Sequence, residues 1–272
     1  MTSSLRKLFD FSGKRVLVTG ASSPLGAAIA LRFAEAGAFT VLHYNAGLEA
    51  VRVLEEKLAA LGAACVSFQA DLSEPAEVKR LFAQISSAGG NLDVCVNNAG
   101  IYPVTALTDM PAEEWMRVVG TNLSGVHYCT KEAAVLMKAD GEKTSSGSPS
   151  SEPCTHAIVN ISSIEAEQPG AGHSHYAASK AGLVAYTKAA AQELGPFGIR
   201  VNAVLPGLID RPGLGTVWPE GVAAYKAAAA LGRLGQPQDV ADACLFLASP
   251  AASWITGAVL RVDGGVGAAR GY

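Results

Sequence analysis

The chain has 272 residues, of which 49% are hydrophobic and 17% charged, and its formal net charge is −3. This length favours one large α/β domain over two small ones. The chain has no basic run of the kind found in nucleic-acid-binding proteins, so we expect no nucleic-acid partner. No segment reaches the ~18 consecutive apolar residues of a membrane span, and residues 1–14 have no signal-peptide core. We therefore expect a soluble, cytoplasmic protein that binds no membrane.

Apolar segments alternate with amphipathic helical patterns along most of the chain. The predicted strands are nearly continuous apolar runs, as is typical of strands covered on both faces; they are Arg15–Thr19, Phe39–Tyr44, Cys65–Ala70, Leu92–Val96, His156–Ile161, Arg200–Val204 and Val259–Val262. Helix-length patterns lie between them at Pro24–Ala36, Leu48–Leu61, Pro75–Ser86, Ala112–Met137, Tyr176–Leu194 and Pro237–Ala248. This alternation predicts an α/β fold, in which a seven-stranded parallel sheet of the doubly wound Rossmann type carries helices on both faces.

Two segments interrupt this alternation within what we predict to be a single domain, residues 1–272. Residues 139–155 (ADGEKTSSGSPSSEPCT) are rich in Ser, Gly and Pro, which indicates a flexible surface insertion. Residues 207–232 begin with a stretch rich in Gly and Pro that follows the sixth predicted strand. Ligands of such sheets bind beyond the carboxyl ends of the strands, so residues 207–232 are predicted to form a substrate lid.

The five cysteines, Cys65, Cys95, Cys129, Cys154 and Cys244, are scattered along the chain. None forms a Cys-x-x-Cys pair or a Cys/His cluster with the spacing of a zinc site. We expect them to be small buried hydrophobic residues in a reducing compartment, and we expect no metal site.

The segment Thr19–Gly26 (TGASSPLG) connects the first predicted strand to the first helix. Gly20 can adopt the tight turn of a dinucleotide-binding loop, and Gly26 permits close packing of the helix on the sheet. Pro24 stands where such a loop usually has a further glycine, and it removes one backbone N–H. Proline is nevertheless favoured at the first position of a helix, so the substitution is compatible with a phosphate site. By itself the segment is also compatible with an ordinary turn before a helix.

Four residues of this loop are candidate phosphate contacts. Ser22 or Ser23 is the expected N-cap of the helix. The amides of Leu25 and Gly26 follow at the positive end of the helix dipole, where an anion is stabilised.

The second predicted strand ends in His43-Tyr44-Asn45 and has no acidic residue there. NAD-dependent enzymes usually carry an acid about 20 residues after the glycines to bind the ribose hydroxyls. Its absence permits a 2′-phosphate, to which His43, Tyr44, Asn45 and the loop serines could donate hydrogen bonds. No Arg or Lys is present in either stretch. We therefore expect NADP(H) as the preferred cofactor, with NAD(H) possible.

Tyr176 and Lys180 are spaced i and i+4 in YAASK, so they share one face of the predicted helix. Ser163 precedes Tyr176 by a loop long enough to return its hydroxyl to the phenol. A tyrosine with its ordinary pKa near 10 is a poor acid–base at neutral pH. A nearby ammonium and a positively charged nicotinamide would both lower that pKa. Ser163 could then hold a carbonyl oxygen while Tyr176 gives or takes the proton.

Taken together and in this order, these motifs resemble those of the short-chain dehydrogenase/reductase family over residues 12–266. Further matching motifs are Asp71-Leu72, the NNAG turn Asn97–Gly100, Asn122 in TNLSG, Pro206-Gly207, and Val262–Gly265 (VDGG). The resemblance implies that the catalytic residues are Asn122, Ser163, Tyr176 and Lys180. It implies cofactor contacts from Gly20, Ser22, Ser23, Leu25, Gly26, Tyr44, Asn45, Asp71, Leu72, Asn98, Ala99, Gly100, Tyr176, Lys180, Pro206, Gly207, Ile209 and Arg211. Asn122 would support a water in the proton relay.

Three positions depart from the family pattern. Pro24 replaces the middle glycine, and Ser23 stands where many NADP-dependent members have a basic residue. Arg211 occupies a position where the family often has a threonine that contacts the nicotinamide carboxamide. Arg211 could replace that contact, reach a phosphate or an anionic substrate, or be solvated.

The resemblance implies a carbonyl reductase or alcohol dehydrogenase that interconverts a ketone and a secondary alcohol. The expected pocket walls are the Ile101–Pro103 turn, the Ile164–His175 loop and the Leu208–Trp218 lid. Apolar walls suit an apolar or aromatic ketone. Polar residues, namely Glu165, Gln168, His173 and His175, suit a sugar or polyol. A sugar or polyol dehydrogenase and a polyketide or acyl-carrier ketoreductase remain open as alternatives, as does an NADP-binding sensor or scaffold without catalysis.

The predicted helices 112–137 and 176–194 are apolar on more than one face, which exceeds what one core-facing stripe requires. In the family these helices pair between subunits. We therefore expect a homotetramer, or else a homodimer.

Overall fold

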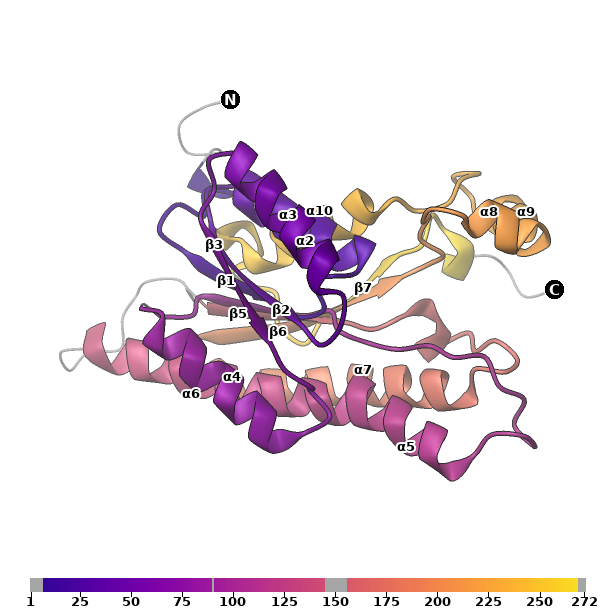
Figure 1. Ribbon diagram of the computed structural model, residues 1–272, viewed down its shortest axis with the longest axis horizontal. Coiled ribbons are helices and arrows are strands. Elements are labelled where there is room, and N and C mark those ends of the chain that lie inside the picture. Colours follow the sequence, from indigo (N-terminus) through magenta and orange to yellow (C-terminus); the bar gives the residue numbers. More distant parts are fainter. Residues whose placement is uncertain (1–6, 90, 145–155, 269–272) are drawn as a thin grey trace.

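A computed structural model of the protein describes residues 7–89, 91–144 and 156–268. Its centre is a seven-stranded parallel sheet with the strand order β3-β2-β1-β4-β5-β6-β7 (Figure 1). The strands are β1 (Arg15–Val18), β2 (Phe39–Tyr44), β3 (Cys65–Gln69), β4 (Val94–Asn97), β5 (His156–Ile161), β6 (Ile199–Pro206) and β7 (Val259–Val262). The predicted doubly wound, Rossmann-type sheet is confirmed, with strand ends that differ by one or two residues.

Helices cover both faces of the sheet (Figure 1). One face carries α2 (Pro24–Glu35), α3 (Leu48–Ala60) and α10 (Pro237–Ala248). The other carries α4 (Pro75–Ser87), α5 (Ala112–Val119), α6 (Gly125–Thr144) and α7 (Ser174–Leu194). None of the helices in the described ranges is long and apolar enough to cross a bilayer.

Strand β1 is the point from which the sheet grows in both directions. It pairs with β2 through Val16 and Thr40 and with β4 through Val16 and Val94. The chain first winds outward to β3 and then crosses back to β4, so the strand order reverses between β1 and β4. At such a reversal the loops beyond the carboxyl ends of the strands diverge and leave a crevice for ligands.

The core consists of two apolar layers separated by the sheet. On the α2 side, Ile29 and Phe33 pack with Leu42 and with buried residues of α10. On the other side, residues of α4, α6 and α7 pack against alternate residues of the same strands, among them Leu17 and Ile158. Because both faces of the strands are buried, the sequence shows continuous apolar runs and no alternation.

The predicted helix Ala112–Met137 is divided in the structure. Helix α5 ends at Val119, a π-helical segment follows at Gly120–Ser124, and α6 then continues to Thr144. The segment Gly120–Ser124 contains no proline that would break a helix, so its residue types do not indicate the π turn.

The predicted insertion at residues 139–155 is wrong in its first part, because α6 includes residues 139–144. Ala139, Glu142 and Lys143 favour helix, although the segment as a whole is polar. The remainder of the insertion lies outside the described residues.

The predicted lid contains two short helices, α8 (Leu214–Val217) and α9 (Pro219–Ala228). Its second half is attached to the end of β7: the Tyr225 hydroxyl donates to the Asp263 carbonyl (2.8 Å), and the Leu231 amide donates to the Gly264 carbonyl (3.0 Å). The lid is therefore anchored at its carboxyl-terminal end.

Candidate active site

The turn before α2 is closed by Ser23. Its hydroxyl accepts a hydrogen bond from the Gly26 amide (3.0 Å) and donates one to the Gly20 carbonyl (2.9 Å). Pro24 occupies the first position of the helix, as predicted. The amide of Gly26 is thus used within the turn, which corrects the expectation that it is available to a phosphate. The Leu25 amide lies at the second helical position, where a helix provides no acceptor of its own.

Both glycines of the loop are required because neighbouring backbone atoms lie too close to leave room for a side chain. Gly20 has a φ of +66°, and a Cβ there would lie 2.8 Å from the Ala99 Cα. A Cβ at Gly26 would lie 2.3 Å from the Gly20 carbonyl oxygen. The Asn98 side chain donates to the Thr19 carbonyl (2.9 Å), so the turn after β4 fixes the loop after β1.

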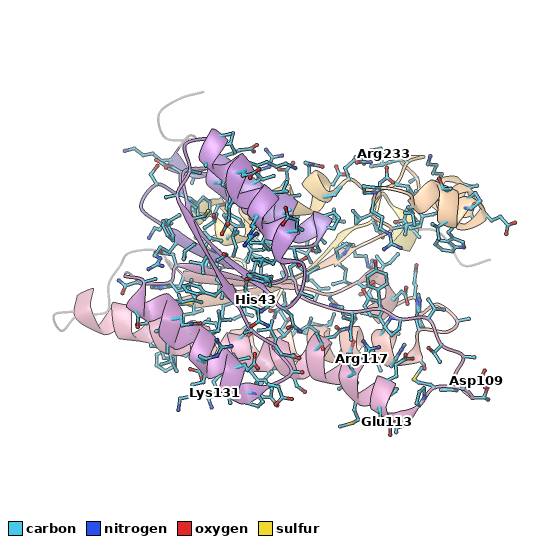
Figure 2. The ribbon with its side chains drawn as sticks, in the orientation of Figure 1. His43, Asp109, Glu113, Arg117, Lys131 and Arg233 are labelled. Carbon is cyan, nitrogen blue, oxygen red and sulfur yellow. The ribbon has the colours of Figure 1, made fainter. Side chains whose placement is uncertain are left out.

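His43 holds this loop in place through hydrogen bonds from the protein interior, and its side chain does not face a ligand. The Gly20 amide donates to its Nδ1 (3.2 Å), and its Nε2 bonds to the Ala70 carbonyl (3.0 Å). The side chain is 1% exposed, and burial lowers its pKa to about 4. Figure 2 shows it in the interior, whereas Asp109, Glu113 and Lys131 lie at the periphery. The expectation that His43 could bind a 2′-phosphate is therefore wrong.

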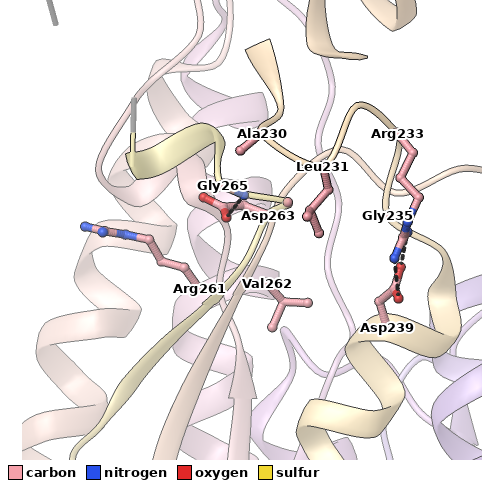
Figure 3. A pocket seen from close by; sticks show the side chains of 10 residues that line it. Ala230, Leu231, Arg233, Gly235, Asp239, Arg261, Val262, Asp263 and Gly265 are labelled. Carbon is pink, nitrogen blue, oxygen red and sulfur yellow. Dashed lines mark hydrogen bonds and ion pairs between the residues drawn. The ribbon is translucent and has the colours of Figure 1, made fainter. Parts of the chain in front are cut away.

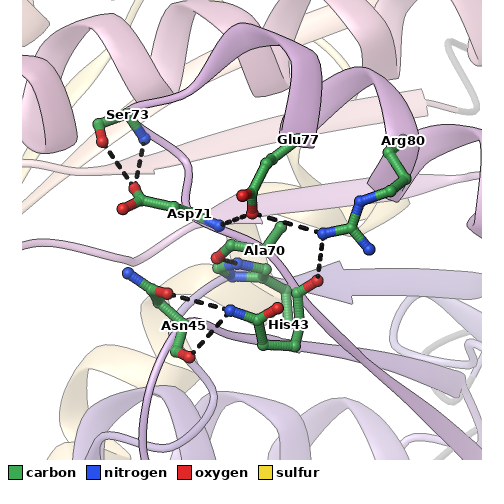
Figure 4. Close-up of polar contacts among 8 residues, drawn as sticks. His43, Asn45, Ala70, Asp71, Ser73, Glu77 and Arg80 are labelled. Carbon is green, nitrogen blue, oxygen red and sulfur yellow. Dashed lines mark hydrogen bonds and ion pairs between the residues drawn. The ribbon is translucent and has the colours of Figure 1, made fainter.

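The end of β2 and the segment after β3 lie side by side (Figure 4). Asn45 is exposed and accepts a hydrogen bond from the Gln69 side chain (3.2 Å). The carboxylate of Asp71 accepts hydrogen bonds from the amide and hydroxyl of Ser73, which lower its pKa. Leu72, the other member of the predicted pair, has its side chain buried in the core. Gly47, just after Asn45, approaches Ser22, so the two predicted cofactor segments are adjacent.

The Ser–Tyr–Lys set is brought together by β5 and α7. Ser163 follows β5 and caps a short 3₁₀ turn, Ile164–Ala166, by accepting from the Glu165 amide (3.1 Å). Tyr176 lies in the first turn of α7, and Lys180 lies one turn later. The Lys180 ammonium is 5.6 Å from the centre of the Tyr176 ring and donates to the Ile161 carbonyl (2.7 Å).

The electrostatics of this set differ from the sequence expectation. Burial raises the pKa of Tyr176 to about 12, and a hydrogen bond with Ser163 acts in the opposite direction. Burial lowers the pKa of Lys180 to about 8. The ammonium is directed at a backbone carbonyl and does not offset the desolvation of the phenol. The residues of the chain therefore do not lower the Tyr176 pKa by themselves, and the expected decrease would need the positive charge of a bound nicotinamide.

Asn122 lies in the π-helical segment and is fully buried. Its Oδ1 accepts from the Ile101 amide (2.9 Å), and its Nδ2 donates to the Ile101 carbonyl (2.8 Å) and to the Ser179 hydroxyl (3.3 Å). The side chain thus ties the turn after β4 to α7 one turn after Tyr176, at Ser179.

A second set of buried amides, which sequence reasoning did not assign individually, joins the sheet to α6 and α7. The Asn97 side chain donates to Asn160 (2.9 Å) and to Thr130 (3.1 Å), and the Asn160 side chain donates to Thr187 (2.9 Å). Buried polar groups that satisfy one another in this way specify one packing arrangement.

Aromatic side chains surround the Tyr176 phenol. The Tyr102 ring lies 6.1 Å from the Tyr176 ring, and the His173 ring lies 6.0 Å from it. Arg211 donates a hydrogen bond to the Tyr102 hydroxyl. The lid therefore meets the turn after β4 beside Tyr176, a contact between segments that no local motif indicated.

The predicted pocket residues differ in burial. His175 is fully buried against α5, where its Nε2 lies 3.5 Å from a Glu114 carboxylate oxygen, so it is not a pocket wall. Leu214 is buried, whereas Val217 and Gln168 are exposed. Ile209 is partly buried in the core and pairs with Gly235.

A cavity of about 440 Å³ lies at the end of β7 (Figure 3). It is lined by the second half of the lid and by Arg261–Gly265, and it contains none of the four predicted catalytic residues. Its Arg233 is paired with Asp239 through two hydrogen bonds (2.6 and 3.0 Å). This cavity is therefore separate from the Ser163, Tyr176 and Lys180 set.

The chain is similar to known proteins over nearly its whole length. The family described as enoyl-(acyl carrier protein) reductase matches residues 20–267. L-rhamnose 1-dehydrogenase (NAD(P)(+)) from Azotobacter vinelandii is 39% identical over 260 residues, which cover 93% of this chain and 96% of that protein. 3-Oxoacyl-(acyl-carrier-protein) reductase FabG from Staphylococcus aureus is 37% identical over 253 residues, which cover 93% and 98%. The crystal structure of a short-chain type dehydrogenase/reductase from Mycobacterium marinum has a TM-score of 0.85 and 35% identity, covering 96% of this chain and 98% of that one.

These relatives are named as dehydrogenases and reductases, and the fold and the match extend over almost all of the chain. The protein is therefore an oxidoreductase that acts on alcohols and ketones. It belongs to the short-chain dehydrogenase/reductase family, as its motifs implied, and the non-catalytic sensor or scaffold alternative is not supported.

Proposed function

We propose that the protein is an NADP(H)-dependent enzyme that interconverts a ketone and a secondary alcohol, with Tyr176 as the general acid and base. The observation that supports this proposal is the arrangement of Tyr176, whose phenol interacts with the Ser163 hydroxyl and whose ring centre lies 5.6 Å from the Lys180 ammonium, one helical turn away. These groups lie beyond the carboxyl ends of parallel strands, where this fold binds its ligands.

Each residue has a defined task in this proposal. NADP(H), when bound, supplies or accepts the hydride at the carbonyl carbon. Tyr176 gives its hydroxyl proton to the oxygen as negative charge develops there, and Ser163 donates a hydrogen bond to the same oxygen. Lys180 places an ammonium one helical turn from the phenol, and together with the positive charge of a bound nicotinamide it would favour loss of that proton. Asn122 keeps the turn after β4 and α7 in register.

The residues of the crevice fit a dinucleotide. The glycine loop approaches the turn after β4 closely, and α2 presents its amino terminus with the Leu25 amide. The family resemblance implied further contacts with the rest of the cofactor, and we keep them as candidates: Asp71, Leu72, Asn98, Ala99, Gly100, Tyr176, Lys180, Pro206, Gly207, Ile209 and Arg211. The Arg211 side chain is held by a hydrogen bond to the Tyr102 hydroxyl. Ser22, Tyr44 and Asn45 carry no negative charge, so the end of β2 itself does not repel a 2′-phosphate; a carboxylate close by is that of Asp71, which interacts with the Asn45 side chain. The uncharged end of β2 favours NADP(H), while NAD(H) is also accepted.

Two alternatives for the substrate are each favoured by one relative. The L-rhamnose 1-dehydrogenase relative favours a sugar or polyol. The 3-oxoacyl-(acyl-carrier-protein) reductase relative favours an acyl or polyketide ketone. The polar residues near Tyr176, Glu165 and His173, distinguish between them.

The Tyr176→Phe variant tests the proposal. Because the phenol transfers the proton, turnover of NADPH with a panel of ketones should fall by about 10²- to 10⁴-fold. NADPH binding, measured by fluorescence titration, should change little. Tyr186→Phe on the same helix is the matched control, because its hydroxyl contacts His127 and not the catalytic set. Turnover retained in Tyr176→Phe would reject the assignment.

The cofactor part of the proposal is tested in the same assay. We expect a higher kcat/KM with NADPH than with NADH for the wild-type enzyme. A clear preference for NADH would contradict it.

A further inference from the structure

Glu165 and His173 form a pair on the loop that connects Ser163 to Tyr176. The Nδ1 of His173 lies 3.0 and 2.9 Å from the two carboxylate oxygens of Glu165. An ionised carboxylate can accept hydrogen bonds but has no proton to donate. The proton of this hydrogen bond therefore lies on Nδ1, which is the donor. The contact fixes the orientation of the imidazole. Because Nδ1 is occupied by Glu165, Nε2 is the ring nitrogen that remains for another hydrogen bond.

The Nε2 atom of His173 has no hydrogen-bond partner among the described residues and is shielded from solvent. The side chains of the pair are otherwise at the rim of the fold, at 21% exposed for His173 and 23% for Glu165. A shielded polar atom without a partner costs free energy, and such atoms are uncommon in folded proteins. A bound group that reached Nε2 would remove this cost.

The pair lies next to the reacting centre. The His173 ring is 6.0 Å from the Tyr176 ring, and the Glu165 carboxylate is close enough to raise the pKa of Tyr176 further. If Ser163 and Tyr176 hold the substrate oxygen, the neighbouring carbon of the substrate lies beside this loop. A negative carboxylate there disfavours an anionic or purely apolar group and favours a hydrogen-bond donor.

The loop that carries the pair is held in place at several points. Arg261 on β7 donates to Glu167 (2.6 Å), and the Thr105 amide donates to the Gly172 carbonyl (2.9 Å). Gly172 has a φ of +79°, a conformation that glycine adopts without strain. These contacts orient the pair before any ligand binds, which is what selective recognition requires.

We propose that the Glu165–His173 pair binds a hydroxyl group on the carbon next to the reacting carbonyl. The substrate is then an α-hydroxy ketone and its product a vicinal diol, the functional groups of polyols and sugars. A hydroxyl fits this pair because it can donate to the carboxylate or to a neutral Nε2, and it can accept from Nε2 when the ring is protonated. The inference rests on the proposed function, since it places the hydroxyl relative to an oxygen held by Tyr176.

Matched substrates that differ by one hydroxyl test this inference. The kcat/KM for 2-hydroxycyclohexanone is compared with that for cyclohexanone, and the kcat/KM for hydroxyacetone with that for acetone, with NADPH in each case. One hydrogen bond to a charged group corresponds to a preference of about 10- to 100-fold for the hydroxylated member of each pair. In His173→Leu and Glu165→Gln this ratio should fall towards one.

Two further variants separate recognition from structural effects. His173→Gln keeps a donor and an acceptor and should retain most of the preference. Glu193→Gln removes an exposed carboxylate from α7 and should leave the ratio as in the wild type. A wild-type enzyme that reduces ketones without any gain from the added hydroxyl overturns the inference and leaves the proposed function intact.

Equal losses for both members of each pair in His173→Leu would also overturn it, because the pair would then act on the loop and not on the hydroxyl. If no ketone of the panel is reduced by the wild-type enzyme, the proposed function fails, and this inference fails with it.

Discussion

His43 illustrates what burial does to a single residue in this fold. From the sequence it stands at the end of β2, where side chains often contact the cofactor, and it looked like a phosphate ligand. In the structure it is enclosed between the glycine loop and the segment after β3, and each ring nitrogen has a backbone partner. The same ring that cannot reach a phosphate therefore holds Gly20 in the position that a dinucleotide requires.

The lowered pKa of His43 leads to a prediction about acid stability. Burial lowers that pKa from its ordinary 6.5 to about 4, so between these pH values the unfolded chain binds a proton that the folded chain does not. The free energy of unfolding should therefore fall as the pH drops from 6.5 to 4, by up to about 3 kcal/mol from this residue. His43→Gln can keep both hydrogen bonds and does not titrate, so it should lose this part of the pH dependence.

Urea unfolding at pH 7 and pH 5 measures the effect. His127→Gln replaces an exposed histidine and is the matched control, which should follow the wild type. An equal pH dependence in the wild type and His43→Gln would contradict the prediction.

The active site also depends on an irregular element. The π-helical segment Gly120–Ser124 lies between α5 and α6, which follow each other without a loop. It places the Asn122 side chain in contact with both the turn after β4 and α7. If this segment were a regular α-helix, the residues of α6 would be rotated about the helix axis relative to their observed positions. Such π segments are frequent at functional sites because they redirect one side chain without ending the helix.

We expect Asn122→Ala to affect stability and turnover together. The change removes the partner of both backbone groups of Ile101, which should lower the free energy of unfolding by about 1–3 kcal/mol. It should also lower kcat, because Asn122 is the side chain that hydrogen-bonds both to the turn next to Tyr102 and to the Ser179 hydroxyl on α7. Without it these two segments are no longer connected. Thermal unfolding and steady-state rates measure the two effects.

Ser124→Ala, in the same π segment, is the control, because its side chain makes no hydrogen bond among those found in the described residues. An Asn122→Ala protein with wild-type stability and turnover would show that the segment is not needed to position the site.

At the scale of the whole molecule, α5 and α6 present apolar side chains that the chain itself does not cover. Trp115, Met116 and Val135 are exposed on these helices. Exposed apolar residues along one surface are typical of protein–protein interfaces. They support the expectation that the helix predicted at 112–137 pairs between subunits, whereas none of the large exposed apolar side chains of the described residues lies on α7.

We therefore expect light scattering to give a homotetramer, with a homodimer as the alternative. Val135→Glu places a charge on this surface and should shift the protein to a smaller assembly, because burying an unpaired charge is costly. Leu61→Glu, at an exposed position beyond the end of α3, is the control and should not change the mass. A wild-type monomer would contradict the prediction.

Most of the fold could be predicted from the sequence, for local reasons. The alternation of apolar runs with helical periodicity specifies the strands, the helices and the parallel sheet, because each pattern acts over a few residues. The spacing of Tyr176 and Lys180 likewise places them on one face of α7, and the Ser23–Pro24 cap follows from the residue types. The ordered motifs identify the family, and with it the class of reaction.

Other properties depend on groups that are distant in sequence, and only the tertiary structure decided them. The burial of His43, the contact of Arg211 with Tyr102, and the raised pKa of Tyr176 all depend on which segments pack together. The same is true of the unpartnered Nε2 of His173, whose ring lies 6.0 Å from the Tyr176 ring. Desolvation and charge–charge interactions depend on three-dimensional distance, and local sequence patterns carry no direct record of that distance.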